Sequence, residues 1–537
     1  MPPATTFRNP VIPGFFPDPS ICRVGEDYYL VCSSFEYFPG VPIFHSRDLI
    51  SWRQIGNVLD RPSQLDLPAD TYASRGIFAP TIRHHNGVFY LVTTNVRIWR
   101  HLIVTATDPA GPWSEPVQFQ LPLIDPSLTW DEDGDCWLTL AGTSNYRIDP
   151  ATGEVFEGPI PLWSGTGGQY PESPHLYRIG DWWYLLLSEG GTHTGHAVSV
   201  ARSRSVRGPF EPAPVNPILT HRGLQRPIQA TGHADLVDDP NGNWWMVLLG
   251  IRPKGQWPPF HVLGRETMLA PVRWEHGWPV VGPVDEEMPM PPGVAAPTGP
   301  SALDVRDDFD ADRLDPSWIS PRSRPDGSWS LTERPGWLTL TALGPTLDRP
   351  GATIIGRRQQ HHDCRAAVRM ETDGRAGLTV RIDEAHHYDL EVSDGTARVW
   401  ARIGPLRQSV AECAVPPGSV NLAVTVRSTD PLPPTVTSAE QFARLSGPLG
   451  IRAAGPDTVT FTVDAGDGDG DGDGDGDGDG DGPTVLAALD GRYLSTEVAA
   501  GFTGRVIGMY VTEGTAAFDW FDYRAQPDAG PGPATTA

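Results

Sequence analysis

Three acidic residues in the first third of the chain stand in short segments that are rich in proline. Asp18 and Asp125 each precede a Pro-Ser pair, and Glu172 lies between Pro171 and Ser173-Pro174. Proline and apolar neighbours fix the backbone and limit hydration, and crowded carboxylates then have their pKa values pushed apart. One acid can remain ionised while another keeps its proton, which is the combination that cleavage of a glycosidic bond requires.

An internal repeat places these acids at equivalent positions. A strand signature rich in aromatic residues recurs five times, with steps of 61, 48, 45 and 62 residues between its copies. The copies are Asp27–Val31, Gly87–Val92, Asp135–Leu138, Gly180–Leu185 and Asn243–Val247. A segment rich in Pro or Gly lies roughly ten residues before each copy. These segments contain Asp18, Phe78-Ala79-Pro80, Asp125, Glu172 and His233.

Short strands of this spacing, separated by Gly, Pro and Asp turns, favour an all-β fold with a five-bladed β-propeller. An irregular β-sandwich is the alternative, but it leaves the spacing unexplained. In a propeller the first strand of each blade lines the axis, so the five segments should form a ring at one mouth. A single aspartate in an Asp-Pro-Ser turn is ordinarily a turn residue, whereas three acids at equivalent positions indicate chemistry.

These segments closely resemble glycoside hydrolase family 43, in particular its β-xylosidase and α-L-arabinofuranosidase members. The matching stretches run in the family's order from residue 9 to about 285. They are 9–20, 34–42, 125–127, 172–177 and 263–267. The resemblance implies a five-bladed propeller and hydrolysis with inversion of the anomeric configuration.

The resemblance also assigns roles to individual residues. Asp18 is implied as the general base that activates water, and Glu172 as the general acid that protonates the leaving oxygen. Asp125 would orient Glu172 and act on it by like-charge proximity. Arg265 is similar to the arginine that contacts substrate hydroxyls and neighbouring carboxylates.

Three further residues are assigned to binding. Phe35 and Phe78 are placed in the subsite of the terminal sugar, although packing in the core is the alternative for such aromatics. His233 resembles a histidine near the channel axis, where some relatives bind a calcium ion through water. His233 is therefore the candidate for a structural Ca²⁺ site, against the alternative of a purely structural histidine. No cofactor is expected to be required.

Two departures from the family pattern affect substrate preference. Many β-xylosidases of the family have Gly where Ser173 stands, and many have Trp where Phe78 stands. Neither change removes a catalytic group, but both lie near the first subsite. They bear on the choice between xylose and arabinose more than on the reaction.

A second domain follows a Pro-rich linker. The predicted organisation is a catalytic propeller over 1–287, a linker over 288–302, a β-sandwich over 303–525 and a tail over 526–537. Short alternating strands favour a two-sheet sandwich, and its segments resemble the concanavalin-A-like domain attached to one branch of these xylosidases. The Gly-Asp alternation over 466–482 cannot bury apolar surface, so we expect a disordered loop there.

The charge and cysteine content of the chain argue against some classes of binding partner. The net charge is −25, and without the eight aspartates of the Gly-Asp alternation the remainder carries −17. No basic face stands out, which argues against nucleic acid as a partner. The five cysteines show no CxxC spacing, so neither a disulfide framework nor a zinc site is indicated. No signal peptide or apolar run of 18 residues is present, so no membrane partner and a cytoplasmic location are expected.

The leading hypothesis is an inverting exo-hydrolase that releases β-1,4-linked D-xylose from the non-reducing ends of xylo-oligosaccharides. An α-L-arabinofuranosidase, or a bifunctional enzyme acting on arabinoxylo-oligosaccharides, is the alternative. A non-catalytic sugar-binding propeller and a retaining fructan hydrolase are weaker hypotheses. The sequence leaves the oligomeric state open, a homo-oligomer included.

Overall fold

The structure is a computed structural model that describes residues 6–255, 258–290, 305–429, 455–464 and 483–526. The chain divides into two compact units, Met1–Arg252 with Arg265–Thr298, and Pro253–Gly264 with Gly299–Ala537. Within the described ranges helix is confined to α2 (Thr496–Ala499) and the 3₁₀ turns η1 (Ala141–Thr143) and η2 (Gly491–Leu494), so the all-β prediction is confirmed. None of the helices described is long and apolar enough to cross a membrane.

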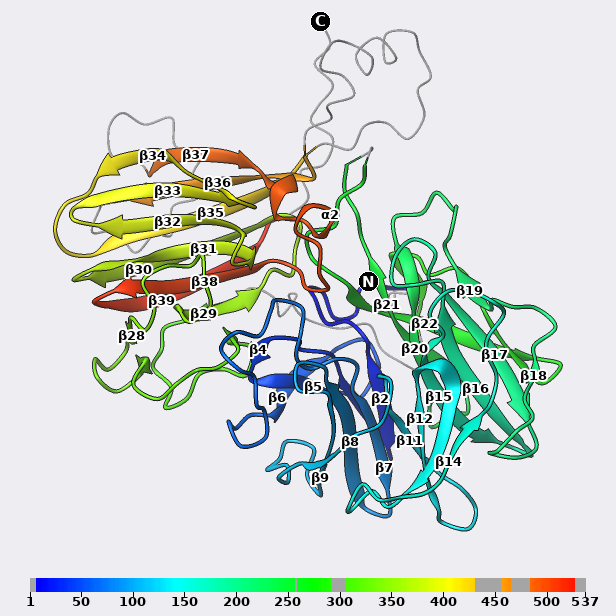
Figure 1. Cartoon of the computed structure of the whole chain (residues 1–537). Helices are drawn as coiled ribbons and strands as arrows, with labels where there is room; N and C mark the ends of the chain where they lie inside the picture. The colour runs from blue at the N-terminus through cyan, green and yellow to red at the C-terminus, as the bar shows by residue number, and fades with distance from the viewer. Residues whose placement is uncertain (1–5, 256–257, 291–304, 430–454, 465–482, 527–537) are drawn as a thin grey trace, which may run out of the picture. The chain divides into compact units, whose positions relative to one another are not determined.

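The first unit contains five antiparallel sheets in which four strands pair in chain order (Figure 1). Sheet 1 comprises β2 (Ser20–Val24), β3 (Asp27–Val31), β5 (Gly40–Ser46) and β6 (Arg53–Leu59). Sheet 2 comprises β7 (Thr81–His85), β8 (Val88–Asn95), β9 (Arg100–Ala106) and β10 (Val117–Phe119). Sheet 3 comprises β11 (Ser127–Trp130), β12 (Cys136–Leu140), β13 (Ser144–Ile148) and β14 (Val155–Pro161).

The remaining two sheets follow the same plan. Sheet 4 comprises β15 (Glu172–Ile179), β16 (Trp182–Glu189), β17 (Ala197–Ser203) and β18 (Glu211–Pro212), with β19 (Leu219–Thr220) also paired to β17. Sheet 5 comprises β20 (Gln229–Asp238), β21 (Trp244–Ile251), β22 (Glu266–Glu275) and β23 (Trp278–Val281). The two-residue strand β4 (Tyr37–Phe38) lies in the connection between β3 and β5.

The aromatic segments of the repeat form the second strand of each sheet, namely β3, β8, β12, β16 and β21. Each of these strands carries a leucine with no exposed surface, Leu30, Leu91, Leu138, Leu186 and Leu248. A strand with both neighbours in its own sheet and apolar residues on its faces is buried between adjacent sheets. The recurrence in the sequence therefore reflects one buried strand per sheet.

The first strands of the five sheets contact one another in cyclic order: β2 with β7, β7 with β11, β11 with β15, β15 with β20, and β20 with β2. Residues Asp18 and Asp125 come two positions before a first strand, Glu172 begins one, and His233 lies within one. The strand order thus brings the predicted acids to the same edge of the five sheets.

A short strand pair joins the beginning and the end of the first unit. Strand β1 (Thr6–Arg8) pairs antiparallel with β24 (Glu287–Pro289). Asn9 follows β1 and is buried; its side chain donates to the Leu269 and Asp285 carbonyls. Strand β24 includes the first two residues of the predicted linker, while 291–304 lie outside the described residues.

The second unit contains two large antiparallel sheets (Figure 1). One comprises β25 (Val305–Asp307), β27 (Trp329–Ser330), β28 (Leu338–Thr341), β39 (Thr515–Ala525), β30 (Cys364–Thr372), β35 (Val420–Ser428), β36 (Asp457–Asp464) and β37 (Thr484–Asp490). The other comprises β29 (Thr353–Arg358), β38 (Val506–Glu513), β31 (Arg375–Asp383), β32 (His386–Ser393), β33 (Thr396–Ile403) and β34 (Leu406–Ala414). Strand β26 (Ser320–Pro321) precedes β27.

One hydrophobic core joins the two large sheets. Val368 and Phe518 of the first sheet and Leu390 and Met509 of the second belong to it, and all four are fully buried. Alternation of inward apolar residues along strands of both sheets is the pattern of a β-sandwich, so the predicted sandwich is confirmed. The Gly-Asp alternation connects β36 to β37; it and the predicted tail beyond Gln526 lie outside the described residues.

Candidate active site

The carboxylate of Asp18 is buried, and each of its two oxygens accepts a hydrogen bond. The Ser33 hydroxyl donates to Oδ2 at 2.5 Å, and Arg265 donates to Oδ1 at 3.1 Å. Burial alone would raise the pKa of Asp18, but Arg265 and the Ser33 hydrogen bond outweigh it, so the pKa lies below its ordinary value. Asp18 is therefore held as a carboxylate, the form that can accept a proton.

The carboxylate of Asp125 is buried in a different electrostatic setting. The backbone N–H of Ser173 donates to its Oδ2 at 3.1 Å. Burial and the neighbouring carboxylates of Glu172 and Asp18 raise the pKa of Asp125 well above its ordinary value. A carboxyl group that is desolvated and lies beside other carboxylates favours its neutral form. Asp125 therefore keeps its proton beside Glu172.

Two histidines that approach the acids come from sheets 4 and 5. Nε2 of His196 lies 3.4 Å from Oε1 of Glu172, and Nδ1 of His233 lies 3.5 Å from Oδ1 of Asp18. Burial lowers the pKa of His233, although Asp18 and Glu172 oppose that effect. His233 is thus neutral at neutral pH and does not compete with Arg265 as the cation beside Asp18.

The predicted aromatic residues lie beside these acids. The rings of Phe35 and Phe78 pack edge to face with centroids 5.7 Å apart, and the Arg265 guanidinium lies 5.8 Å from the Phe35 centroid. Phe35 is buried, whereas Phe78 is partly exposed. Arg265 also donates to the Thr192 hydroxyl at 3.0 Å. Arg265 therefore links the aromatic pair to Asp18 and to the connection between β16 and β17.

Left-handed backbone recurs at the acid segments. The φ angles are 57° at Asp18, 55° at Asp125, 53° at Ser173 and 49° at His233. Few non-glycine residues adopt this conformation, and Asp and His do so more readily than most. These kinks occur where the Asp18–His233 contact forms and where Glu172 acts on Asp125.

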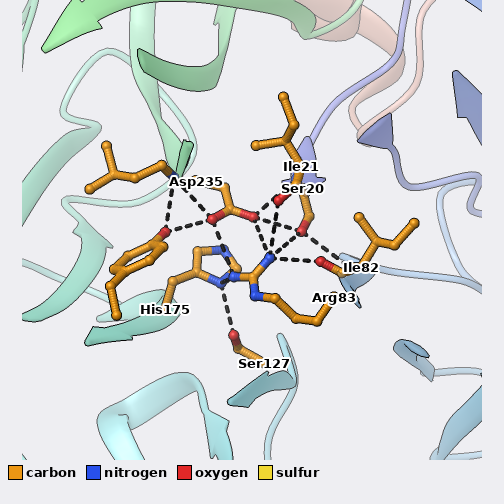
Figure 2. Close-up of polar contacts among 9 residues, drawn as sticks. Ser20, Ile21, Ile82, Arg83, Ser127, His175 and Asp235 are labelled. Carbon is orange, nitrogen blue, oxygen red and sulfur yellow. Dashed lines mark hydrogen bonds and ion pairs between the residues drawn. The ribbon is translucent and has the colours of Figure 1, made fainter. Parts of the chain in front are cut away.

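A second polar cluster lies on the same five first strands, two or more residues further along each strand. Figure 2 shows the Arg83 guanidinium against the Asp235 carboxylate, with N–O distances of 2.8 and 3.2 Å. Ser20 and Tyr177 donate to Asp235, His175 contacts Arg83, and Ser127 contacts His175. Arg83 and Tyr177 lower the pKa of Asp235 despite its burial. This cluster, which we call the strand clamp, connects all five sheets through one side chain or more from each.

Sequence reasoning missed several residues of the site. Ser33, His196 and Thr192 contact the predicted acids or Arg265 but lie outside the proline-rich segments. Ser33 and Thr192 follow the second strands of their sheets, and His196 immediately precedes a third strand. Their position after strand ends at the edge of the acids is the signal that could have found them.

The donor set near His233 does not fit direct coordination of calcium. In the described part of the chain no three His, Cys, Asp or Glu side chains group so as to hold a metal ion. Ca²⁺ takes six to eight oxygen ligands, whereas the carboxylate nearest His233 is already bound by Ser33 and Arg265. Water-mediated binding of Ca²⁺ at His233 stays a prediction.

Comparison with known proteins identifies both parts of the chain. Residues 7–279 match the model of glycosyl hydrolases family 43. Residues 306–462 and 477–524 match the model of the β-xylosidase C-terminal concanavalin A-like domain.

Relatives cover the chain over nearly its whole length. It is 38% identical to a non-reducing end α-L-arabinofuranosidase of Bacteroides ovatus, over 97% of this chain and 95% of that protein. It is 43% identical to a xylosidase/arabinosidase of Butyrivibrio fibrisolvens, over 74% of this chain and 82% of that one. The crystal structure of a xylan β-1,4-xylosidase from Bacillus halodurans matches with a TM-score of 0.82 at 30% identity, covering 96% of this chain and all of that one. With a family model matched over half of the chain and relatives of this coverage, the protein belongs to glycoside hydrolase family 43.

Proposed function

We propose that this enzyme is an inverting exo-hydrolase that releases β-1,4-linked D-xylose from the non-reducing ends of xylo-oligosaccharides. One observation carries the proposal, namely the opposite protonation of two neighbouring groups. Arg265 and Ser33 hold Asp18 ionised, while burial and the neighbouring Glu172 raise the pKa of Asp125, so that Asp125 keeps its proton. A base and an acid in one site are the two groups that an inverting glycosidase needs.

In this mechanism Asp18 removes a proton from a water molecule, which attacks the anomeric carbon. Glu172 donates its proton to the glycosidic oxygen as the bond to the leaving sugar breaks. Asp125 accepts from the N–H of Ser173, the residue after Glu172, so it acts by positioning the segment that carries the acid. The step leaves Asp18 protonated and Glu172 ionised, and exchange with water restores both.

The contacts of His196 support this assignment of the acid. Nδ1 of His196 lies 3.3 Å from the Ala230 carbonyl, which can only accept, so Nδ1 carries the ring proton. Nε2 of the same ring faces Oε1 of Glu172 at 3.4 Å, so the ring lies beside the carboxyl group that donates the proton in this mechanism.

Phe35, Phe78 and Arg265 are proposed as the subsite of the terminal xylose. Aromatic faces pack on the C–H surface of a sugar ring, and a guanidinium donates to its hydroxyl groups. Because Arg265 contacts Asp18 directly, a sugar bound by Arg265 would be held next to the base. The reaction requires no cofactor in this proposal, because both proton transfers are made by the chain's own carboxyl groups.

A main or additional α-L-arabinofuranosidase activity is the second candidate. The Bacteroides ovatus relative, which spans nearly the whole chain, is named for that activity, and the Butyrivibrio fibrisolvens relative is named for both. Furanose and pyranose substrates can present similar hydroxyl groups to the same acids. Arabinoxylo-oligosaccharides would then be substrates alongside xylo-oligosaccharides.

Two assays test the function and its specificity. Rates on an aryl β-D-xyloside and an aryl α-L-arabinofuranoside should favour the xyloside; a strong preference for the arabinofuranoside would replace the first candidate by the second. Glu172→Ala should lower kcat by about 10²-fold or more, because loss of a general acid costs that much. Hydrolysis at the wild-type rate by this variant would refute the catalytic assignment and favour a sugar-binding role.

We also propose that the five four-stranded sheets are the blades of a five-bladed β-propeller. The cyclic contacts of the first strands and the strand clamp that joins them support this arrangement. In this view residues 1–287 form the catalytic domain and 303–525 an accessory sandwich.

A further inference from the structure

Exposed aromatic side chains of the first unit gather at the edge of the sheets where the acids lie. In an antiparallel sheet the start of the first strand and the end of the second strand share one edge. Tyr72 precedes β7, Trp99 follows β8, and Tyr170 precedes β15, which places all three at this edge. Of the large aromatics in the described part of the first unit that are more than about a third exposed, only Phe156, on β14, lies elsewhere.

Tyr170 combines high exposure with a strained backbone. Its residue surface is 70% exposed, yet its φ is 51°, a left-handed conformation that bulky residues rarely adopt. Such a conformation costs on the order of 1 kcal/mol and persists where the surroundings impose it, often at functional sites. An exposed aromatic ring gains little from burial, so the folded core does not explain why this side chain is held there.

Hydrogen bonds hold the loop that precedes Tyr170 in place. The buried carboxylate of Glu189 accepts hydrogen bonds from the backbone N–H and hydroxyl of Thr166 and from the N–H of Gly168. The N–H of Gly190 donates to the Gln169 carbonyl at 2.7 Å. These bonds fix the chain immediately before Tyr170, so the backbone that presents the ring is in place before any ligand binds.

The ring of Tyr170 lies near the residues of the candidate active site. A Cβ placed on Gly191 would be 3.5 Å from Cδ2 of Tyr170, so the ring borders that glycine. The next residue, Thr192, accepts a hydrogen bond from Arg265, which in turn binds Asp18. Along the chain, only Pro171 separates Tyr170 from Glu172.

We propose that Tyr170 is the stacking platform for the sugar unit on the leaving-group side of the scissile bond. This inference rests on the proposed function, in which Glu172 protonates the leaving oxygen. The leaving sugar must then lie against Glu172, and Tyr170 is the exposed aromatic residue nearest to Glu172 in the chain. The C–H face of a pyranose packs on an aromatic ring, so the ligand of this subsite is a xylopyranose unit.

Two substrates with different leaving groups test the platform. Xylobiose places a xylose on the leaving side, whereas methyl β-D-xyloside places only methanol there. Tyr170→Ala should lower kcat/KM on xylobiose about fivefold or more and leave kcat/KM on methyl β-D-xyloside within about twofold. Tyr170→Phe should retain wild-type values on both, and Phe156→Ala serves as the matched control for loss of an exposed aromatic.

A glycine variant separates binding from folding. Tyr170→Gly relaxes the left-handed backbone, so its melting temperature should equal or exceed that of the wild type while kcat/KM on xylobiose falls. An equal loss on both substrates, or an unchanged value on xylobiose, would overturn the platform while wild-type activity shows the proposed function intact. A wild-type chain that cleaves neither xyloside would overturn the proposed function and the platform with it.

Discussion

Asp18 and Asp125 share one local motif but have opposite electrostatic surroundings. Both are followed by Pro-Ser, both are buried, and both have a left-handed backbone. Burial tends to raise both pKa values, but Asp18 faces Arg265 and Ser33 while Asp125 faces Glu172. Partners rather than motif therefore decide which acid is ionised, and the distinction follows from chain segments up to 247 residues apart.

Removal of the Arg265 charge should change the pH dependence of the reaction. In Arg265→Met, burial acts on Asp18 without its nearest cation, so the pKa of Asp18 should rise. The base must be ionised to act, so the acidic limb of the pH profile of kcat/KM should move to higher pH. The value of kcat/KM should also fall. Ser33→Ala, which keeps the charge, should shift the limb less. An unmoved acidic limb in Arg265→Met would contradict this account of Asp18.

At the scale of elements, the first strands carry both the acids and the strand clamp. Ser20 lies two residues after Asp18, Ser127 two after Asp125, and Asp235 two after His233. The strand clamp therefore holds the strands that begin directly after the segments of Asp18 and Asp125, and the strand that contains His233.

Breaking the strand clamp should be strongly destabilising. The Asp235 side chain has no exposed surface, and Arg83→Met would leave its carboxylate without its cation. Loss of one partner of a buried ion pair costs about 3 kcal/mol or more of unfolding free energy. Urea unfolding followed by tryptophan fluorescence would measure it, with Arg178→Met, which breaks the exposed pair with Glu132, as a control of small effect. Equal unfolding midpoints for the two variants would refute the role of the clamp.

The sequence predicted the strands and the acids but not the contacts that tune them. The five aromatic segments were predictable because each is a buried second strand, which needs apolar residues on both faces. The sandwich was predictable from alternation in the same way. Arg83 and Tyr177 were not, because a single polar residue in a strand has the same local signature whether it faces solvent or a buried carboxylate. Their partners are fixed only when five sheets meet.

At the scale of the whole molecule, many buried titratable groups are neutral histidines or paired carboxylates. Burial lowers the pKa of His101 to about 4 and that of His175 to about 3. Burial alone would raise the pKa of Glu384, but Arg381 and Arg322 lower it to about 2. Groups whose folded pKa is depressed bind more protons when unfolded. Stability should therefore fall as the pH is lowered from about 6.5.

His101 offers a direct test of this acid sensitivity. Its ring is fully buried and stacked on Phe119 with centroids 5.2 Å apart. Between pH 6.5 and 4 its protonation in the unfolded chain should remove up to about 3 kcal/mol of stability. His101→Phe should lose less stability than the wild type between pH 7.5 and 4, as measured by melting temperature against pH. Parallel curves for the two proteins would contradict the burial of a neutral His101.

The configuration of the first product tests the central claim most directly, because only attack by a water molecule activated by Asp18 inverts the anomeric carbon. Proton NMR of the hydrolysis of an aryl β-D-xyloside, recorded before mutarotation, would identify the anomer of the one xylose that is released. The account predicts α-xylose as the first-formed product from this β-linked substrate. Initial accumulation of β-xylose would show retention and would contradict the roles given to Asp18 and Glu172.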